Sequence, residues 1–282
     1  MSRGNIGWQL ANMNDNEHLI AGTASGYGPS PKIWSSCPVL PIMLDPTKGF
    51  VYFNDFVHAF AATDTNNQCY DGLLHTERTQ GTISNAPAVP GGVIVLDAGA
   101  DTVNTGITAQ AVGCQCEPGA NTTIYMEWRV LVTVGGGQCF MGLCCDSTTA
   151  PVASGDAIVT NKNLAGFYRD AGTGDTDWTV GVCDASSSEE SDDEVSGASE
   201  SVYEKFGLVL EGIGAVSGSK VTFFHNGEPV YATHDINDMP LLLMCPTFQA
   251  DADGTDRPYM YLDWLRVAVH NTSTGGRDTD GS

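Results

Sequence analysis

Two short loops of this chain contain enough carboxylates to suggest cation binding. One spans residues 251–256 and the other spans residues 170–177. Calcium takes six to eight oxygen ligands, and its known loop pattern ends in a bidentate glutamate that neither loop has. Asp and Gly are also the usual residues of tight turns. We therefore expect turns without metal, and retain only Asp251, Asp253 and Asp256 as weak calcium candidates.

The cysteines are a second group with possible chemistry. A structural zinc site needs pairs spaced as CxxC or CxxxxC, whereas Cys114-Gln-Cys116 and Cys144-Cys145 are closer. The N-terminal sequence has no apolar run typical of a signal peptide, so we expect a cytoplasmic setting that keeps thiols reduced. Buried free thiols are the main interpretation, with a zinc site or a fortuitous disulfide as minor alternatives. The nine cysteines are residues 37, 69, 114, 116, 139, 144, 145, 183 and 245.

Catalytic motifs are not evident. Residues 22–26 lack the GxSxG spacing of a nucleophile elbow, and the glycines of residues 212–218 do not match a dinucleotide fingerprint. The paired-carboxylate pattern of jelly-roll glycosidases, similar to ExDxxE, is also missing. Its nearest approach is Glu189 to Glu194, in a serine-rich acidic stretch. We therefore expect no enzymatic activity and no cofactor.

Charge restricts the class of partner. The 282 residues include 34 acidic and only 12 basic side chains, for a formal charge of −22. Such a field repels phosphate backbones and anionic membranes, so we expect neither nucleic acid nor membrane as a partner. No stretch approaches the roughly 20 apolar residues that span a bilayer. Hydrophobic residues make up 41% of the chain, which is enough for one sizeable core.

Alternating apolar residues dominate the chain and predict strands. Residues 123–134 show the period of two clearly, with Met126, Trp128 and Val130 on one side. Asn226-Gly227 supplies the positive φ angles of a two-residue hairpin, across which His225 and His234 would approach each other. We predict an all-β, two-sheet antiparallel jelly-roll sandwich. Its strands are residues 92–97, 123–134, 138–145, 163–168, 177–183, 205–211, 219–225, 228–234, 242–249 and 258–269.

The last strand and the N-terminal region are related. Strict alternation puts Met260, Leu262 and Trp264 on one face of the last strand, and both of its faces are largely apolar. A sandwich strand normally exposes one face to water, so the second face needs a cover. The proline-rich, apolar segment 29–46 is suited to lie across the body as a strap. The cover is this strap or a neighbouring subunit.

Domain boundaries follow from composition. Residues 1–48 are predicted to form an extended N-terminal arm, and residues 49–270 the jelly roll. The acidic insertion 184–204 cannot nucleate a core and is expected to be a solvated, mobile loop, while residues 271–282 form a polar tail. An aromatic cluster at 50–60 is expected to enter the core, with a short helical turn near 55–61.

The segment Ile33–Phe56 resembles a family of known proteins. Its sequence, IWSSCPVLPIMLDPTKGFVYFNDF, is similar to the WxxCPxxxxLxDPxxGxxFFDDF stretch of tailed-bacteriophage virion proteins. In those proteins it precedes a concanavalin A-like jelly roll, and the resemblance extends to about residue 269. It implies a concanavalin A-like sandwich and membership of a virion. It implies no catalytic or ligand residue.

Two functional hypotheses follow. In the first, the chain is a capsid decoration or cement protein outside a tailed-phage head, assembled in the host cytoplasm with the major capsid protein and copies of itself as partners. Its contacts would come from Trp34, Val39, Leu40, Ile42 and Leu44. Deletion of residues 1–45 would then abolish attachment while the sandwich stays folded. In the alternative, it is a lectin-like adhesin of a head fibre or tail. That protein would bind host glycans on Trp178, Tyr168 and Trp264.

Overall fold

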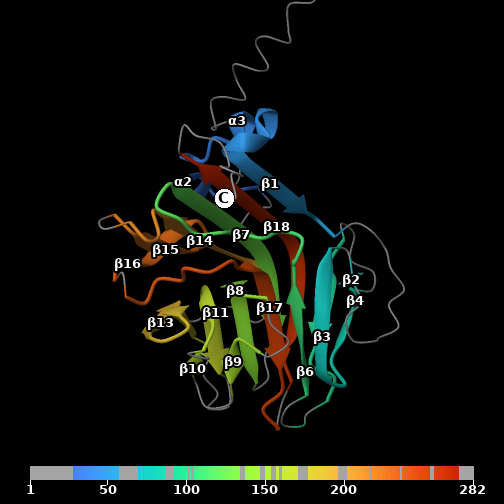
Figure 1. Ribbon diagram of the computed structural model, residues 1–282. Helices are drawn as coiled ribbons and strands as arrows, with labels where there is room; N and C mark the ends of the chain where they lie inside the picture. The colour runs from blue at the N-terminus through green and yellow to red at the C-terminus, as the bar shows by residue number, and fades with distance from the viewer. Residues whose placement is uncertain are drawn as a thin grey trace, which may run out of the picture.

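The chain folds into two antiparallel β-sheets stacked face to face (Figure 1). In this computed structural model the described residues are 28–56, 69–70, 72–86, 92–100, 102, 105–133, 137–146, 150–153, 157–158, 161–170, 177–195, 202–215, 218–235, 237–254 and 257–272. Among these residues, no helix is long and apolar enough to cross a membrane.

Sheet A has the strand order β16-β15-β14-β7-β18-β5-β4. The long β18 also pairs with β1 along its second half, so β5 and β1 share one side of it. The strands are β1 (Gly49–Asn54), β4 (Thr82–Asn85), β5 (Ile94–Asp97), β7 (Thr122–Thr133), β14 (Glu204–Glu211), β15 (Lys220–His225), β16 (Glu228–Thr233) and β18 (Tyr259–Asn271).

Sheet B has the order β13-β12-β11-β8-β17-β6-β3-β2. Its strands are β2 (Cys69–Tyr70), β3 (Leu73–Thr79), β6 (Gly106–Gln110), β8 (Gln138–Cys144), β11 (Asn163–Asp170), β12 (Trp178–Asp184), β13 (Ser188–Val195) and β17 (Cys245–Asp251). A separate two-stranded pair consists of β9 (Val152–Ala153) and β10 (Ala157–Ile158). Val152 and Ile158 contact the outer face of sheet B.

The main core lies between the sheets and is centred on Trp128 of β7. Its buried ring meets Phe167 and Phe248 edge-on at centroid distances of 6.0 Å each, and stacks on Phe206 at 6.3 Å. The Trp128 Nε1–H donates to the sulfur of Met141 at 3.3 Å. This tryptophan therefore joins strands of both sheets.

The all-β, two-sheet antiparallel sandwich expected from the sequence is confirmed, and each predicted strand overlaps an observed one. The Asn226-Gly227 hairpin is also confirmed, with φ angles of 49° and 83° between the antiparallel β15 and β16. The prediction that His225 and His234 approach each other across this hairpin is wrong. His225 lies near the turn and bonds Glu204 at 3.1 Å, whereas His234 bonds the Ser219 carbonyl at 3.2 Å.

The predicted faces of the last strand are wrong beyond Leu262. The register of β18 against β7 shifts between Leu262 and Trp264, which marks a β-bulge. Asp263 occupies the bulge and pairs with Arg129. Beyond it Trp264 moves to the outer face, while Leu265 and the alternate residues after it enter the core.

The N-terminal arm is not extended over its described part. Residues 31–48 form three short helices, α2 (Pro31–Trp34), α3 (Val39–Leu44) and the 3₁₀ turn η2 (Pro46–Lys48). Pro31 and Pro46 sit in the first turns of their helices, where a missing N–H costs nothing and the fixed φ is already helical. Residues 1–27 lie outside the described residues, as does the tail from 273.

The acidic insertion differs from the expected loop as well. Its residues 188–195 form β13, which pairs antiparallel with β12 at the edge of sheet B. Charged residues suit an edge strand because they discourage further pairing. Residues 196–201 are outside the described part. Of the aromatic cluster, Phe56 is buried in the core and Phe53 is exposed, while the expected turn at 55–61 falls mostly on residues not described.

The contacts of Trp128 with four other strands generate a stability prediction. Trp128→Ala should lower the free energy of unfolding by about 3–5 kcal/mol because a large cavity replaces the ring. Trp128→Phe, which keeps an aromatic ring, should cost clearly less. Urea unfolding followed by circular dichroism measures both, and a loss below about 1 kcal/mol for the alanine variant would contradict the central role of this ring.

Candidate binding surfaces

The segment 28–48 contains the predicted strap 29–46 and is called the strap from here on. It is docked on the outer face of sheet A (Figure 1). Trp34 stacks on Tyr125 of β7 with a centroid distance of 6.1 Å. The apolar cluster under the strap consists of Ile33, Trp34, Cys37 and Ile42 from the strap and Tyr125, Val209, Phe224 and Ala268 from the sheet. The cover needed by β18 thus comes, at its second half, from the same chain.

A buried carboxylate fixes the strap in place. Glu127 of β7 is fully buried, and both of its oxygens accept a hydrogen bond from the Ser30 backbone N–H at 3.1 Å. The Trp34 indole N–H donates to the same carboxylate at 2.6 Å. Lys205 of β14 donates from Nζ to the Gly28 carbonyl at 3.1 Å. The strap is therefore held by directional polar contacts as well as by apolar burial.

Burial under the strap shifts the pKa values of the ionisable groups there. Desolvation raises the pKa of Glu127, although the bonds from Ser30 and Trp34 and the nearby charge of Lys205 act in the opposite direction. Burial likewise lowers the pKa of Lys205 and of Arg266, and the Glu127 charge opposes both shifts. Arg266 lies directly across from Glu127 on β18. A carboxylate in such a place needs its donors, because an unpaired buried charge is costly.

The five interface residues predicted from the sequence divide into two groups. Trp34 and Ile42 are buried against the chain's own sheet, and Val39 and Leu40 are half-buried. Leu44, at the end of α3, has 71% of its surface exposed, and its neighbour Met43 has 64%. The end of α3 therefore offers apolar side chains to another molecule, whereas most of the predicted contact set stabilises this chain itself.

A second exposed apolar segment was missed by sequence reasoning. Residues 242–249 were predicted as one strand, but β17 begins only at Cys245. Leu241, Leu242 and Leu243 precede it in a loop and are 53%, 61% and 41% exposed. The sequence signal was present, since Pro240 followed by three leucines is not an alternating pattern.

The structure describes two of the three calcium candidates, Asp251 and Asp253. Asp251 is buried and accepts a bond from the Gln249 amide at 2.7 Å, and Asp256 lies outside the described residues. No group of three or more His, Cys, Asp or Glu is placed to hold a metal ion in the part of the chain that the structure describes.

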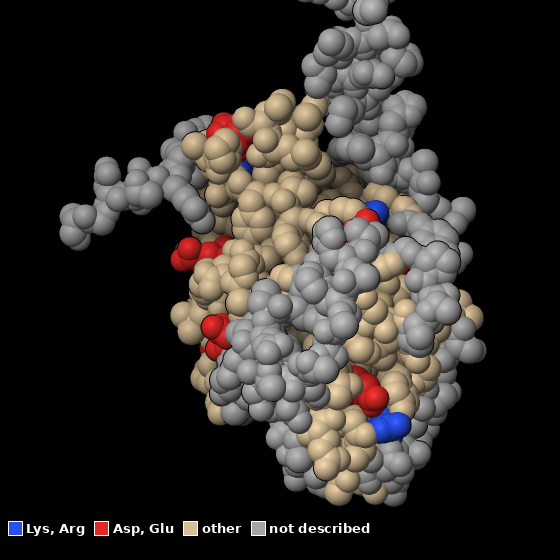
Figure 2. All heavy atoms as spheres, turned by 90° about the vertical axis from the view of Figure 1, so that its right-hand side faces the viewer, with Lys and Arg blue, Asp and Glu red and all other residues tan. Residues whose placement is uncertain are grey.

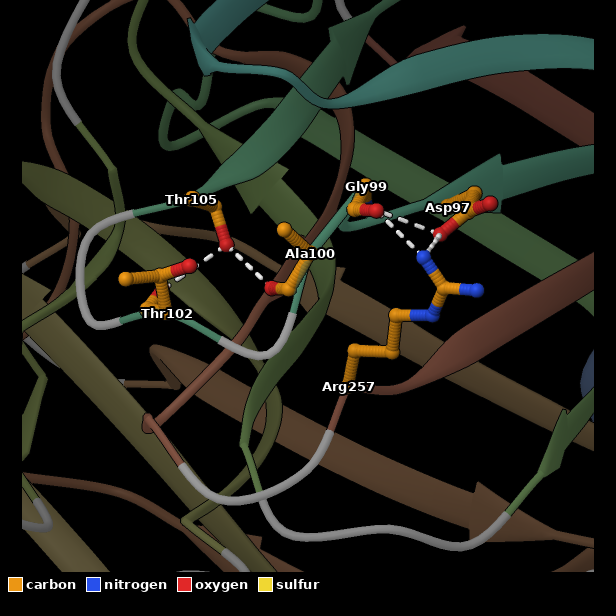
Figure 3. A network of polar contacts seen from close by, with 6 residues as sticks. All are labelled: Asp97, Gly99, Ala100, Thr102, Thr105 and Arg257. Carbon is orange, nitrogen blue, oxygen red and sulfur yellow. Dashed lines mark hydrogen bonds and ion pairs between the residues drawn. The ribbon is translucent and has the colours of Figure 1, made fainter.

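Hydrogen bonds and an ion pair within the chain join the loops that lie near Asp251 (Figure 3). Arg257 donates to the Gly99 carbonyl and pairs with Asp97 at 3.9 Å. The Thr105 hydroxyl donates to the carbonyls of Ala100 and Thr102 at 2.5 and 2.8 Å. The Ala252 N–H, next to the first calcium candidate, donates to the Thr105 carbonyl at 2.9 Å. Arg257 and the Thr105 hydroxyl thus bond the carbonyls of Gly99, Ala100 and Thr102 within the chain.

The candidate glycan platforms are all buried. Trp178 lies in the core against Phe206, and Tyr168 lies under the β9–β10 segment with its hydroxyl on Glu190 at 2.6 Å. Trp264 is covered as well, with the guanidinium of Arg266 at 4.2 Å from its ring centre. None of the three presents a ring face to a sugar.

Two described carboxylates with defined partners lie on the outer face of sheet B. They are Asp251 of β17 and Glu190 of β13, and β8, β11 and β12 lie between these strands. Four strand spacings amount to about 19 Å. Glycosidases hold their two carboxyl groups about 5–10 Å apart. This pair is therefore too widely separated to act as acid and nucleophile.

Acidic side chains are scattered rather than gathered. On the face shown in Figure 2 the described Asp and Glu side chains stand apart from one another, and some of them lie next to a basic side chain. Although acidic residues outnumber basic ones by 34 to 12 in the chain, the described residues form no single acidic patch on this face.

The eight cysteines whose side chains are described are free thiols, and among them only Cys145 is half-exposed. A hydrogen bond from the Cys144 thiol is the main reason that the pKa of Cys145 falls to about 6. Nearby Lys162 contributes in the same direction. Burial raises the pKa of Cys245, opposite Cys144 on β17, to about 12. One reactive thiol thus lies beside inert ones.

Comparison with known proteins gives a likeness of fold only. No family model and no curated protein matches the chain. Among solved structures, an endo-1,3-β-glucanase from Streptomyces sioyaensis matches with a TM-score of 0.48 and 10% identity, covering 78% of this chain and 95% of that one. Peanut lectin matches with a TM-score of 0.48 and 13% identity, covering 80% and 100%.

A Bacillus licheniformis β-glucanase is similar to the same degree, with a TM-score of 0.48, 11% identity and coverage of 78% and 98%. These structures include both sugar-cleaving enzymes and lectins. At such scores and identities they carry neither an activity nor a ligand over to this chain, because one fold hosts many functions.

The raised pKa of Glu127 predicts a pH dependence. Between the ordinary value of 4.5 and the raised one, the folded state binds a proton that the unfolded state does not. This group's contribution to stability should therefore grow as the pH falls through that window. Glu127→Gln cannot titrate and should lack this gain. Denaturation curves of both proteins from pH 7 down to about 4.5 measure the difference, and parallel profiles would refute it.

Cys145 should be alkylated before the seven buried cysteines of the described part. At pH 7 its thiolate predominates, so iodoacetamide should label it well before the seven buried cysteines. The labelling rate should rise with pH around a midpoint of about 6. Peptide mapping by mass spectrometry identifies the site, and Cys145→Ser should remove the fast phase. Uniformly slow labelling at all positions would contradict the assignment.

Proposed function

We propose that this chain is a structural, non-catalytic virion protein that decorates the outer surface of a tailed-phage head. The observation that carries the proposal is the exposure of Met43 and Leu44 at the end of a strap whose Ile33, Trp34 and Ile42 are buried against sheet A. The strap holds these two residues toward solvent on a fixed backbone. The partner surface would be the major capsid protein, with copies of this chain as neighbours.

The free energy of burying Met43 and Leu44 supports such an attachment. Burying a large apolar side chain is worth roughly 1.5–3 kcal/mol. The strap is already ordered by Glu127 and by the apolar cluster beneath it, so attachment would not require ordering a loose arm. Preorganisation of this kind improves affinity by lowering the entropic cost of binding.

The net charge of the chain and its resemblance to virion proteins also support a place on the outer surface of the head. A chain with a formal charge of −22 is unsuited to contact packaged DNA, which favours the outer side of a shell. The segment 33–56, which resembles that of the virion proteins, is the segment that forms most of the strap and β1. Host glycan binding is less favoured, because its three candidate ring platforms are buried.

Deleting residues 1–45 is not a clean test of this function. The deletion would strip Ser30 and Trp34 from the Glu127 carboxylate and uncover Tyr125, Val209 and Phe224, so the sandwich itself would lose stability. Substitutions at the exposed end of α3 avoid this problem.

The double substitution Met43→Ser and Leu44→Ser should leave folding intact and weaken attachment to purified capsid shells at least tenfold, which corresponds to about 1.4 kcal/mol. Co-sedimentation with shells lacking this protein measures the occupancy. Val202→Ser is the matched control, since Val202 is another exposed apolar residue and lies on the segment before β14. Unchanged occupancy for the double variant, or no binding of the unaltered protein, would overturn the proposal.

A further inference from the structure

The loop Leu241–Leu243 is an apolar projection that the proposed attachment through α3 does not use. Three consecutive leucines are exposed there, whereas the flanking Met239 and Met244 are buried in the main core. A soluble protein rarely leaves such a run in water without a partner. The run lies between β16 and β17, on a part of the chain remote in sequence from the strap.

The backbone of this loop is fixed from below. The side-chain oxygen of the buried Asn163 accepts hydrogen bonds from the Leu241 and Leu242 N–H groups at 2.8 and 3.2 Å. On the other side, Met244 and Cys116 exchange two backbone bonds of 2.9 and 2.7 Å. The backbone of Leu241 and Leu242 is therefore held by hydrogen bonds, while all three leucine side chains keep a large exposed surface that another molecule could bury.

Carboxylates lie close to the leucine loop. Asp235 is exposed and Asp238 half-exposed in the same connection, and Asp235 accepts a hydrogen bond from the Asn237 N–H at 3.0 Å. Asp184 lies directly across from Asn163, the residue that holds the leucines. The Ser187 hydroxyl bonds the Asn237 carbonyl at 3.1 Å, which ties the segment after Asp184 to this connection. The nearby Lys162 is buried. The projection is thus apolar at its tip and acidic at its base.

We propose that Leu241–Leu243 dock into a groove of a different protein that is apolar at its centre and lined by Lys or Arg at its rim. A second copy of this chain is a poor occupant, because two acidic bases would face each other and the chain has only 12 basic residues. An anionic lipid surface would be repelled by the same carboxylates. Complementary charge at the rim steers association and sets specificity, while the leucines supply the burial.

Cys145 provides a local readout of docking. Its N–H donates to the Asn163 carbonyl at 2.9 Å, so the half-exposed thiol is attached to the residue that holds the leucines. A partner seated on the loop should slow alkylation of Cys145 by iodoacetamide. Binding elsewhere on this acidic chain should not.

The first experiment does not depend on the proposed function. Its probe is a synthetic helical peptide of alternating Leu and Lys clusters, with one apolar and one basic face. The unaltered protein should bind it with protection of Cys145, and binding should weaken as salt rises from 50 to 500 mM. The double variant Leu241→Ser and Leu242→Ser should bind at least fivefold more weakly and lose the protection. The control Val202→Ser should behave as the unaltered protein.

Equal binding and equal protection in the leucine variant would overturn the inference. A dimer in solution, or binding to anionic vesicles, that the leucine substitutions abolish would overturn the choice of partner. The second experiment rests on the proposed function and uses capsid shells. If the shells bind the unaltered protein and the leucine variant equally, the loop has no role in that attachment and the inference fails for the virion. Failure of the shells to bind any variant counts against the proposed function and leaves the peptide result standing.

Discussion

A desolvated carboxylate on the outer face of sheet A determines how the N-terminal part of this protein is arranged. Glu127 lies on the side of β7 that a simple sandwich would leave to water, and it is nonetheless fully buried. Its charge is acceptable there because the strap brings a backbone N–H and an indole N–H to it, with Lys205 nearby. Glu127 and the strap therefore depend on each other. Without these hydrogen bonds, only a small apolar contact would hold the strap on sheet A. Without the strap, Tyr125, Val209 and Phe224 on the outer face of sheet A would be exposed to water.

The bulge in β18 belongs to the same arrangement. One extra residue at Asp263 transfers Trp264 and Arg266 to the outer face, where Arg266 faces Glu127 across the strands. It also lets Asp263 pair with Arg129, whose guanidinium in turn lies over the ring of Tyr203 at 4.5 Å. A regular strand would have placed Trp264 and Arg266 on the core side. The bulge therefore separates an apolar inner face from an outer face that holds compensated charges.

Strands with strong alternation were predictable because burial of one face repeats every second residue, as in 123–134. The polar and short strands were not. The stretch Ser188–Val195 reads as disordered by composition, yet it forms the edge strand β13, where one neighbour is enough and charge is tolerated. The bulge could not be foreseen, because it depends on the pairing of Asp263 with Arg129 across two strands. For the strap, the sequence identified the covering segment but not the division between residues that hold it down and residues that face outward. That division depends on the position of Glu127, a residue almost a hundred positions away from Ser30.

The large negative charge and the exposed leucines of this protein are physically connected. Leucines held on fixed backbones cannot retreat into the core, so Leu44 and Leu241–Leu243 expose apolar area permanently. Two copies meeting through such residues would bury that area, but each also carries a formal charge of −22. Repulsion between like charges acts over a screening length of about 8 Å at physiological salt, a distance comparable to the separation of side chains around a contact. With a partner rich in basic residues, the electrostatic interaction is attractive instead of repulsive, and the same apolar area is buried. The composition of the chain thus opposes self-association through its apolar residues and favours a partner of opposite charge.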